Sequence, residues 1–209
     1  MTQQPTTGFR LNELLKASDL PEMHPEFLRR CEAYLALLLR WNARLNLTAI
    51  RDQEGILSRH FVESIACAHA IPQGVRTLLD FGSGAGFPGI PIALLRPEIS
   101  VTLAESQGKK AAFLREAVRT LGLAATVWGR RAESLQSTFD CVVMRAVDRM
   151  EAAVSAASGL VSPGGWLVLM TTGSERAELQ AAAGEVFVWC AVRLASSVDC
   201  LLVTGHRAG

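Results

Sequence analysis

The feature that most constrains the fold is a glycine-rich turn, Gly82-Ser83-Gly84-Ala85-Gly86, set between an apolar run and a helical stretch. The run Thr77–Phe81 is typical of a buried strand, and Gly89–Leu95 is typical of a helix. Glycines let the backbone turn sharply and approach a ligand, and the N-terminus of the next helix favours negative charge. A strand, a glycine turn and a helix in this order indicate a doubly wound α/β fold, whose ligands bind beyond the carboxyl ends of the strands.

After Pro72 the chain alternates short apolar runs with helical stretches, which predicts a mostly parallel sheet with helices on both faces. The further strands that we expect are Val101–Ala104, Thr126–Trp128, Cys141–Met144 and Trp166–Thr171, the last preceded by a turn at Pro163-Gly164-Gly165. The further helices that we expect are Lys109–Leu121 and Met150–Leu160. Near the end, only Ser196-Ser197 separates the runs Val186–Ala195 and Val198–Thr204, which permits an antiparallel hairpin and excludes a parallel crossover.

Before Pro72 the apolar residues recur at helical spacing instead. They predict one helix over about Pro25–Leu45, with a proline in its first turn, and a second from the N-cap Asp52 to just before Pro72. We therefore expect an N-terminal helical lobe at residues 1–72 and an α/β domain at residues 73–209, packed as one unit.

The composition excludes several classes of protein. The 21 basic and 20 acidic residues nearly cancel, so the total charge does not indicate a nucleic-acid partner. The five cysteines are widely spaced and form no Cys-x-x-Cys pair, so we expect neither a disulfide framework nor a metal site. Because no segment is apolar over ~18 residues and Met1–Arg10 are polar, we expect a cytoplasmic protein without membrane spans or signal peptide. No sustained heptad pattern indicates a dimer, so we expect a monomer.

Two acidic residues indicate which ligand the glycine turn binds. Glu105 ends the second expected strand, where its carboxylate can accept hydrogen bonds from both ribose hydroxyls of an adenosine-containing cofactor. The glycine spacing is G-x-G-x-G, and the third glycine of the dinucleotide pattern G-x-G-x-x-G would fall on Phe87. Asp80 would repel a pyrophosphate but suits a cofactor that carries a sulfonium and an ammonium group. The motif thus favours S-adenosylmethionine over a dinucleotide, with a merely structural turn as a third possibility.

Other polar residues follow the third and fourth strands, at the same edge of the sheet. Arg131-Ala132-Glu133 follows the third strand, where backbone or carboxylate could contact an adenine edge. Arg145 follows the fourth strand, on the side where a methyl acceptor would bind. Taken singly, each is more often a solvated loop charge, but their common position at the strand ends favours a binding role.

The glycine turn continues in a more restrictive pattern, and the stretch Leu79-Asp80-Phe81-Gly82-Ser83-Gly84-Ala85-Gly86-Phe87-Pro88-Gly89-Ile90-Pro91 resembles the signature of the bacterial glucose-inhibited division protein B family. Members of that family are guanine-N7 methyltransferases of small-subunit ribosomal RNA. The resemblance runs from about residue 33 to about residue 170. Its other matching stretches are Trp41-Asn42, Asn46–Ile50, Arg59-His60-Phe61, Gly108-Lys109-Lys110 with Phe113-Leu114, Arg131-Ala132-Glu133 and Arg145-Ala146-Val147.

The resemblance implies a Rossmann-like class I methyltransferase with a mostly parallel seven-stranded sheet, an antiparallel C-terminal hairpin and an N-terminal helical lobe. It implies S-adenosylmethionine as cofactor and guanine 527 of 16S ribosomal RNA, in the 30S subunit, as target. By analogy the cofactor contacts are Gly82, Phe87, Glu105, Ala132, Glu133 and Arg145, to which the motif itself adds Asp80, Ser83, Gly84 and Gly86. The chain departs from the family pattern at Glu63, where Asp is usual, at Thr172-Gly173 and at Asp199-Cys200, which affects the expected RNA contacts.

Methylation of guanine N7 needs no general base, because that nitrogen presents a lone pair and has no proton to lose. We therefore expect a site that works by positioning and desolvation, with Arg145 and His60 orienting the target base. The expected phosphate-binding residues are Arg59, Lys109, Lys110 and Arg131. A methyltransferase of the same fold for a small molecule or a protein, a non-catalytic cofactor- or ribosome-binding module, and a nicotinamide oxidoreductase are the alternatives.

Overall fold

The apolar runs in the second part of the chain form a seven-stranded sheet with the order β3-β2-β1-β4-β5-β7-β6. The computed structural model describes residues 6–194 and 199–209. The first five strands are parallel to one another, and β7 is antiparallel to both β5 and β6. The strands are β1 (Thr77–Phe81), β2 (Ser100–Ala104), β3 (Thr126–Trp128), β4 (Phe139–Arg145), β5 (Val161–Thr172), β6 (Phe187–Arg193) and β7 (Cys200–Arg207). The predicted seven-stranded class I fold is confirmed.

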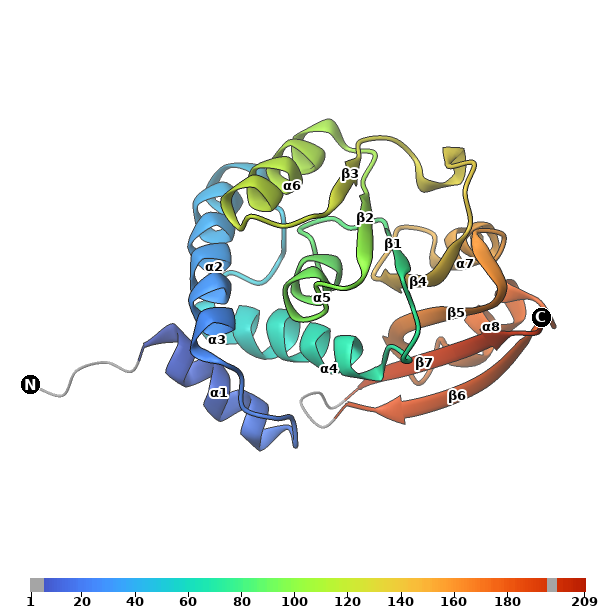
Figure 1. Ribbon diagram of the computed structural model, residues 1–209, viewed down its shortest axis with the longest axis horizontal. Helices are drawn as coiled ribbons and strands as arrows, with labels where there is room; N and C mark the ends of the chain where they lie inside the picture. The colour runs from blue at the N-terminus through green and yellow to red at the C-terminus, as the bar shows by residue number, and fades with distance from the viewer. Residues whose placement is uncertain (1–5, 195–198) are drawn as a thin grey trace, which may run out of the picture.

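Helices cover both faces of this sheet because successive strand residues point to opposite sides. Leu78 of β1 belongs to the core on one face, and its neighbour Leu79 belongs to the core on the other. The first face carries α5 (Gly89–Leu95) and α6 (Gly108–Thr120), and the second carries α7 (Met150–Ser158) and α8 (Arg176–Ala183) (Figure 1). The short 3₁₀ helix η2 (Ala132–Ser134) follows β3.

The N-terminal helices pack on the face that carries α5 and α6 (Figure 1). They are α1 (Thr7–Ala17), α2 (Pro25–Leu45), α3 (Gln53–Gly55), the π-helical turn η1 (Ile56–Val62) and α4 (Glu63–Ala70). Helix α2 has the predicted bounds, with a proline in its first turn and Asn46 in a left-handed conformation at its C-cap. Asp52 caps α3 as predicted, by accepting a hydrogen bond of 2.6 Å from the Gly55 N–H.

One hydrophobic core joins these helices to the sheet, running from Leu11 of α1 to Leu202 of β7. The Tyr34 hydroxyl of α2 donates a hydrogen bond to the Ala85 carbonyl of the glycine turn, and an Arg30 amino group donates one to the Leu121 carbonyl. The division of the chain at residue 72 therefore stays a prediction about folding units.

Two features differ from the sequence prediction, and a third is not tested. Helices α1 and α8 were not predicted, because α1 starts within polar residues and α8 buries only Leu179 and Ala183, too few to form an apolar stripe. The expected turn at Pro163-Gly164-Gly165 is wrong, because β5 already starts at Val161 and these residues form an irregular part of that strand. Ser196 and Ser197, expected between the hairpin strands, lie outside the described residues.

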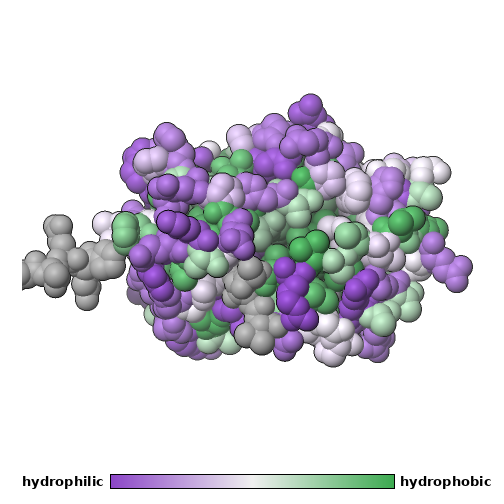
Figure 2. Space-filling view, turned by 90° about the horizontal axis from the view of Figure 1, so that it is seen from below, coloured by the Kyte–Doolittle hydropathy of each residue, from purple (hydrophilic) through white to green (hydrophobic). Residues whose placement is uncertain are grey.

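The exposed large hydrophobic residues concentrate at the edge strand. Val188 and Val192 of β6 are 75% and 59% exposed, and Val186 lies just before them. Figure 2 views the molecule from the side of β6 and shows apolar surface surrounded by hydrophilic residues. Within residues 6–194 and 199–209, no helix combines the length and the apolar character that a membrane span requires.

Candidate functional site

A cavity of about 650 Å³ opens at the carboxyl ends of β1, β2 and β4. Between β1 and β4 the chain order reverses, since β2 and β3 extend the sheet to one side and β5 to the other. This is the switch point where doubly wound sheets bind ligands, and the volume is within the roughly 300–1,000 Å³ of ligand sites. Leu47, Thr48 and His60 from the N-terminal helical part also line the cavity, so both parts of the chain form its wall.

The glycine turn lies against the cavity floor in a backbone conformation that glycine favours. Gly82, Gly84 and Gly86 have φ angles of +76°, +55° and +89°. At Gly82 a Cβ atom would lie 2.9 Å from the Val147 side chain, so this residue is also fixed by close packing. Gly82, Ser83 and Gly84, which were predicted to bind the cofactor, line the cavity, whereas Gly86 packs behind the turn against Ile90 and Tyr34.

Glu105 is held rigidly at the end of β2. One carboxylate oxygen accepts a hydrogen bond of 3.0 Å from the Gly84 N–H, and the other accepts one of 2.7 Å from the Gln107 N–H. The side chain is 6% exposed and lines the cavity. A carboxylate has about four acceptor positions, so each oxygen keeps a lone pair for a ligand hydroxyl. This donor and acceptor set fits the predicted contact with a ribose.

The structure places Asp80 differently from the prediction. Asp80 is 1% exposed and does not line the cavity. Its carboxylate accepts a hydrogen bond of 3.1 Å from the Gly89 N–H, at the start of α5, and burial raises its pKa to about 7. Asp80 therefore holds the start of α5 beneath the glycine turn and is not part of the cavity lining.

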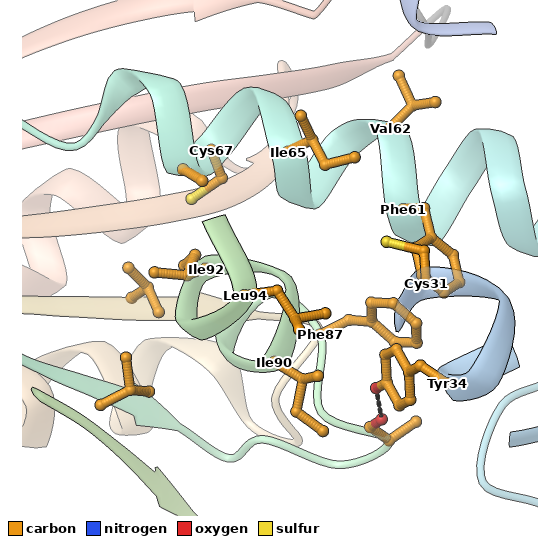
Figure 3. Close-up of a cluster of buried hydrophobic side chains, with 14 of the residues drawn as sticks. Cys31, Tyr34, Phe61, Val62, Ile65, Cys67, Phe87, Ile90, Ile92 and Leu94 are labelled. Atoms are coloured by element: carbon orange, nitrogen blue, oxygen red, sulfur yellow. Dashed lines mark hydrogen bonds between the residues drawn. The ribbon is translucent and has the colours of Figure 1, made fainter. Parts of the chain in front are cut away.

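Phe87 lines the cavity but is mainly a core residue, with only 7% of its surface exposed. Its ring lies 5.1 Å from that of Tyr34 and 5.2 Å from that of Phe61, and Figure 3 shows the three rings gathered between α2, η1 and the glycine turn. His60 stacks on the same ring with a centroid distance of 4.8 Å. The Phe87 ring thus packs against one face of the His60 imidazole.

His60 projects into the cavity from the π-helical turn η1, a rare conformation that is frequent at functional sites. Its Nε2 lies 2.7 Å from the Thr48 hydroxyl, while its buried Nδ1 has no hydrogen-bond partner. Burial, together with the guanidinium groups of Arg145 and Arg59, lowers the pKa of His60 to about 3. The imidazole is therefore neutral at physiological pH.

Arg145, the last residue of β4, also lines the cavity. Its Nη2 lies 2.9 Å from a carboxylate oxygen of Glu63 and donates a hydrogen bond of 2.8 Å to the Arg59 carbonyl. Its Nη1 is buried and has no partner. In the part of the chain that the structure describes, His60 Nδ1 and Arg145 Nη1 are the buried side-chain nitrogen or oxygen atoms that lack a hydrogen bond, and both residues line this cavity.

The other predicted residues divide into two groups. Those that line the cavity are Lys110, Arg131, Ala132 and Glu133. Arg59 and Lys109 do not line it, although Arg59 is 57% exposed beside it and forms an ion pair of 3.1 Å with Glu63. Residues that sequence reasoning had not assigned to the site also line it, among them Thr48, Gln107 and Arg149.

The loop after β4 forms the remaining wall. Ala146 and Arg149 have positive φ angles of 47° and 52°, which are unfavourable for residues other than glycine. Strained backbone of this kind concentrates at ligand sites. No group of three or more metal-ligating side chains is present in residues 6–194 and 199–209.

Comparison with known proteins agrees with this geometry. The family model described as rRNA small subunit methyltransferase G matches residues 28–200. The chain belongs to this family. Relatives named ribosomal RNA small subunit methyltransferase G include a Xanthomonas euvesicatoria protein, 46% identical over 140 residues, which are 66% of this chain and 65% of that protein. A Stenotrophomonas maltophilia protein of the same name is 47% identical over the same shares of the two chains. The match thus spans about 65% of the length of these curated relatives.

Solved structures show the same fold as this methyltransferase G family member. A methyltransferase from Pyrococcus furiosus superposes with a TM-score of 0.61 at 13% identity, covering 87% of this chain and 98% of that one. A SAM-dependent methyltransferase from Aquifex aeolicus gives a TM-score of 0.59 at 16% identity, covering 74% of this chain and 93% of that one. At these identities the likeness concerns the fold alone.

Proposed function

We propose that this chain is an S-adenosylmethionine-dependent methyltransferase that methylates N7 of a guanine, guanine 527, in 16S ribosomal RNA. Family membership supports the reaction class and the RNA substrate. The observation that carries the proposal is the pair of unpartnered polar atoms, Arg145 Nη1 and His60 Nδ1, in one cavity with the glycine turn and Glu105. Buried polar groups are normally satisfied, so such a pair indicates where a ligand binds.

The cavity fits the cofactor by the chemistry of its donors and acceptors. Glu105 offers free lone pairs to ribose hydroxyls, and the open space beside Gly84 lets a ligand approach the backbone closely. Ala132 and Glu133, in η2 after β3, are available to the adenine edge. When bound, S-adenosylmethionine supplies a methyl group on a positively charged sulfur.

The residues of the chain then have to hold a guanine with N7 facing that methyl group. Arg145 Nη1 is a fixed donor, since an arginine has no acceptor and stays charged. His60 Nδ1 is a second donor in the tautomer in which Nε2 accepts the hydrogen bond of 2.7 Å from the Thr48 hydroxyl. Two donors suit the O6 oxygen of guanine, whose binding leaves N7 free.

Methylation of guanine N7 removes no proton, so a neutral histidine and an ion-paired arginine are sufficient for the reaction. The low pKa of His60 keeps its ring uncharged beside two guanidinium groups. The described residues lining the cavity include no serine or cysteine paired with a basic histidine. The rate would come from orienting the base and from excluding water, which are positioning effects.

The basic residues at the rim favour the RNA backbone. Lys110, Arg130, Arg131 and Arg149 all line the opening of the cavity. We propose that they contact phosphates, together with Arg59 and Lys109 outside it, and that the chain acts as a cytoplasmic monomer on the 30S subunit. We also propose that residues 1–72 and 73–209 act together, because both contribute to the cavity.

The test is a methylation assay on 30S subunits from a strain that lacks this protein, with the modified base mapped by mass spectrometry. We expect one methyl group on N7 of guanine 527. Transfer to another atom, or activity only on a small molecule or a protein, would contradict the proposal. S-adenosylhomocysteine should also raise the melting temperature by mass action, and NAD should not, which separates this cofactor from a dinucleotide.

A further inference from the structure

Glu63, the first residue of α4, is a buried carboxylate shared by two arginines. Its side chain is 1% exposed, with one oxygen 3.1 Å from Arg59 Nε and the other 2.9 Å from Arg145 Nη2. Burial raises the pKa of the nearby Cys200 thiol to about 11, and the negative charge of Glu63 adds to that effect. Glu63 therefore lies where η1, α4, β4 and β7 meet, in contact with Arg145 of the cavity wall.

The two arginines differ in where they lie. The side chain of Arg59 is 57% exposed, whereas that of Arg145 is 13% exposed. Burial lowers the pKa of Arg145 below its usual value, and the opposite charge of Glu63 acts against that effect. A buried guanidinium needs such a counter-charge, because an unpaired buried charge is strongly unfavourable.

The contacts of Arg145 also determine where its free amino group points. Nη2 is engaged twice, by the Glu63 carboxylate and by the Arg59 carbonyl at 2.8 Å. A guanidinium is planar, so fixing one amino group on two acceptors restricts the rotation of the whole group. Nη1 is thereby left unpartnered in a residue that lines the cavity.

Stability alone does not account for this arrangement. Buried ion pairs are often no more stable than apolar residues of similar volume. Here the ion pair joins the N-terminal helical part to the end of β4. Its cationic residue, Arg145, lines the cavity and has one donor, Nη1, that makes no hydrogen bond within the described part of the chain.

We infer that Glu63 is a positioning residue of the methyl-transfer site, which acts through Arg145 by holding the guanidinium in one orientation, with Nη1 directed at the ligand. This inference rests on the proposed function. It assigns no contact with substrate or cofactor to Glu63 itself, since that residue does not line the cavity.

The test is a double-mutant cycle with Glu63→Gln, Arg145→Gln and the pair, because coupling within a cycle isolates residues that act together. With 30S subunits as substrate, we expect Glu63→Gln to lower kcat at least tenfold with a smaller change in KM. In the Arg145→Gln background the same substitution should change kcat by less than twofold. If Glu63→Gln leaves kcat unchanged, or lowers it by the same factor in both backgrounds, the inference is wrong.

Matched variants separate positioning from folding. Glu63→Asp keeps the negative charge and should retain far more activity than Glu63→Gln, whereas equal losses would contradict a role for the charge. Glu54→Gln is the control, since Glu54 also pairs with an arginine, Arg10, but away from the cavity. If the Glu63→Gln protein does not fold, the kcat of Glu63→Asp is compared with that of wild type and with that of the double variant Glu63→Gln with Arg145→Gln, in which both charges are removed. That comparison still tests the inference.

A spectroscopic readout does not depend on the RNA. The ¹⁵N signals of the Arg145 guanidinium, assigned by their loss in Arg145→Gln, should show restricted rotation in wild type and in Glu63→Asp but fast rotation in Glu63→Gln. Unrestricted rotation in wild type would refute positioning. An inactive wild-type protein with a restricted guanidinium would refute the proposed function and leave the positioning role standing.

Discussion

Glu105 and Gly84 are joined by a hydrogen bond of 3.0 Å from the backbone N–H of the glycine to the carboxylate. The acidic residue at the end of β2 thus fixes the loop at the end of β1, and the two sides of the expected cofactor site form one rigid unit. The carboxylate is only 6% exposed, so what remains accessible faces the cavity.

Glu105→Gln should weaken the binding of S-adenosylhomocysteine by roughly 10- to 100-fold, because hydrogen bonds to a charged group contribute about 1.5–3 kcal/mol. Isothermal titration calorimetry measures the change in Kd. Glu116→Gln is the control, since Glu116 pairs with Arg40 on the surface of α6 and does not line the cavity. An unchanged Kd in Glu105→Gln would mean that the ribose binds elsewhere.

Two glycines of the turn should tolerate alanine differently. Gly82→Ala and Gly84→Ala both place a side chain at positive φ, which costs about 1–2 kcal/mol. At Gly82 the new Cβ atom would also lie 2.9 Å from the Val147 side chain, whereas at Gly84 the nearest atom is 3.8 Å away. Urea unfolding should show that Gly82→Ala is the more destabilised by about 1 kcal/mol or more. Adding Val147→Ala to Gly82→Ala should remove this additional destabilisation. If the double variant is no more stable than Gly82→Ala, the close contact with Val147 is not the cause.

The sequence predicted most of the fold because its apolar runs and glycines are strong local signals. β1, β3, α2 and α5 have the predicted bounds. Hydrophobic spacing could not distinguish the π-helical turn η1 from an α-helix, since both bury one side of the chain, and it is this turn that carries His60.

The sequence predicted which residues lie near the site better than it predicted where their side chains point. Position at a strand end indicates which side chains lie near the ligand edge, but alternation along the strand decides which of them face the cavity. Asp80 has the same parity as Leu78, whose side chain packs in the core on the α5 side, so its carboxylate is directed at Gly89. Glu63 had no signal beyond its difference from the family pattern, because its role depends on contacts with Arg145, which is far away in sequence.

His60→Gln should lower kcat/KM for methyl transfer about tenfold while the protein stays folded. A glutamine amide can reach the position of Nε2 and keep the contact with Thr48, but it leaves nothing at Nδ1. Because the pKa of His60 is about 3, its ring does not titrate near neutrality, and the ratio of wild-type to variant activity should be constant from about pH 5.5 to 8. A ratio that falls as the pH drops through 6.5 would show that the histidine is protonated in the working enzyme.

Asp80 should give the protein a stability that decreases with rising pH. Its pKa is raised from 3.8 to about 7 by burial, so between these values the folded protein holds a proton that the unfolded chain has lost. The folded state therefore loses relative stability as the pH rises through this window, and the loss is complete above about 7. Urea unfolding of wild type and Asp80→Asn at pH 5 and pH 8 should show the variant gaining about 2–3 kcal/mol relative to wild type at the higher pH. A constant difference would show that Asp80 is already ionised at pH 5 in the folded protein.

Lys109→Gln with Lys110→Gln should weaken binding to the 30S subunit and flatten its dependence on salt. Both lysines lie in the first turn of α6, and Lys110 lines the cavity opening beside Arg130 and Arg131. Each phosphate contact that is lost reduces the slope of log K against log salt by about 0.7–0.9, so losing both should reduce it by roughly 1.5. Titrations between about 50 and 200 mM salt measure that slope.

The matched control for this pair is Lys16→Gln with Arg29→Gln, which removes the same charge from α1 and α2 at positions that do not line the cavity. A general effect of net charge would flatten both slopes equally, because the field of the whole protein falls by the same two charges. Flattening confined to the α6 pair would locate the RNA backbone beside the cavity opening. Since the protein carries a net charge of only +1, binding to a polyanion depends on such local clusters rather than on the total.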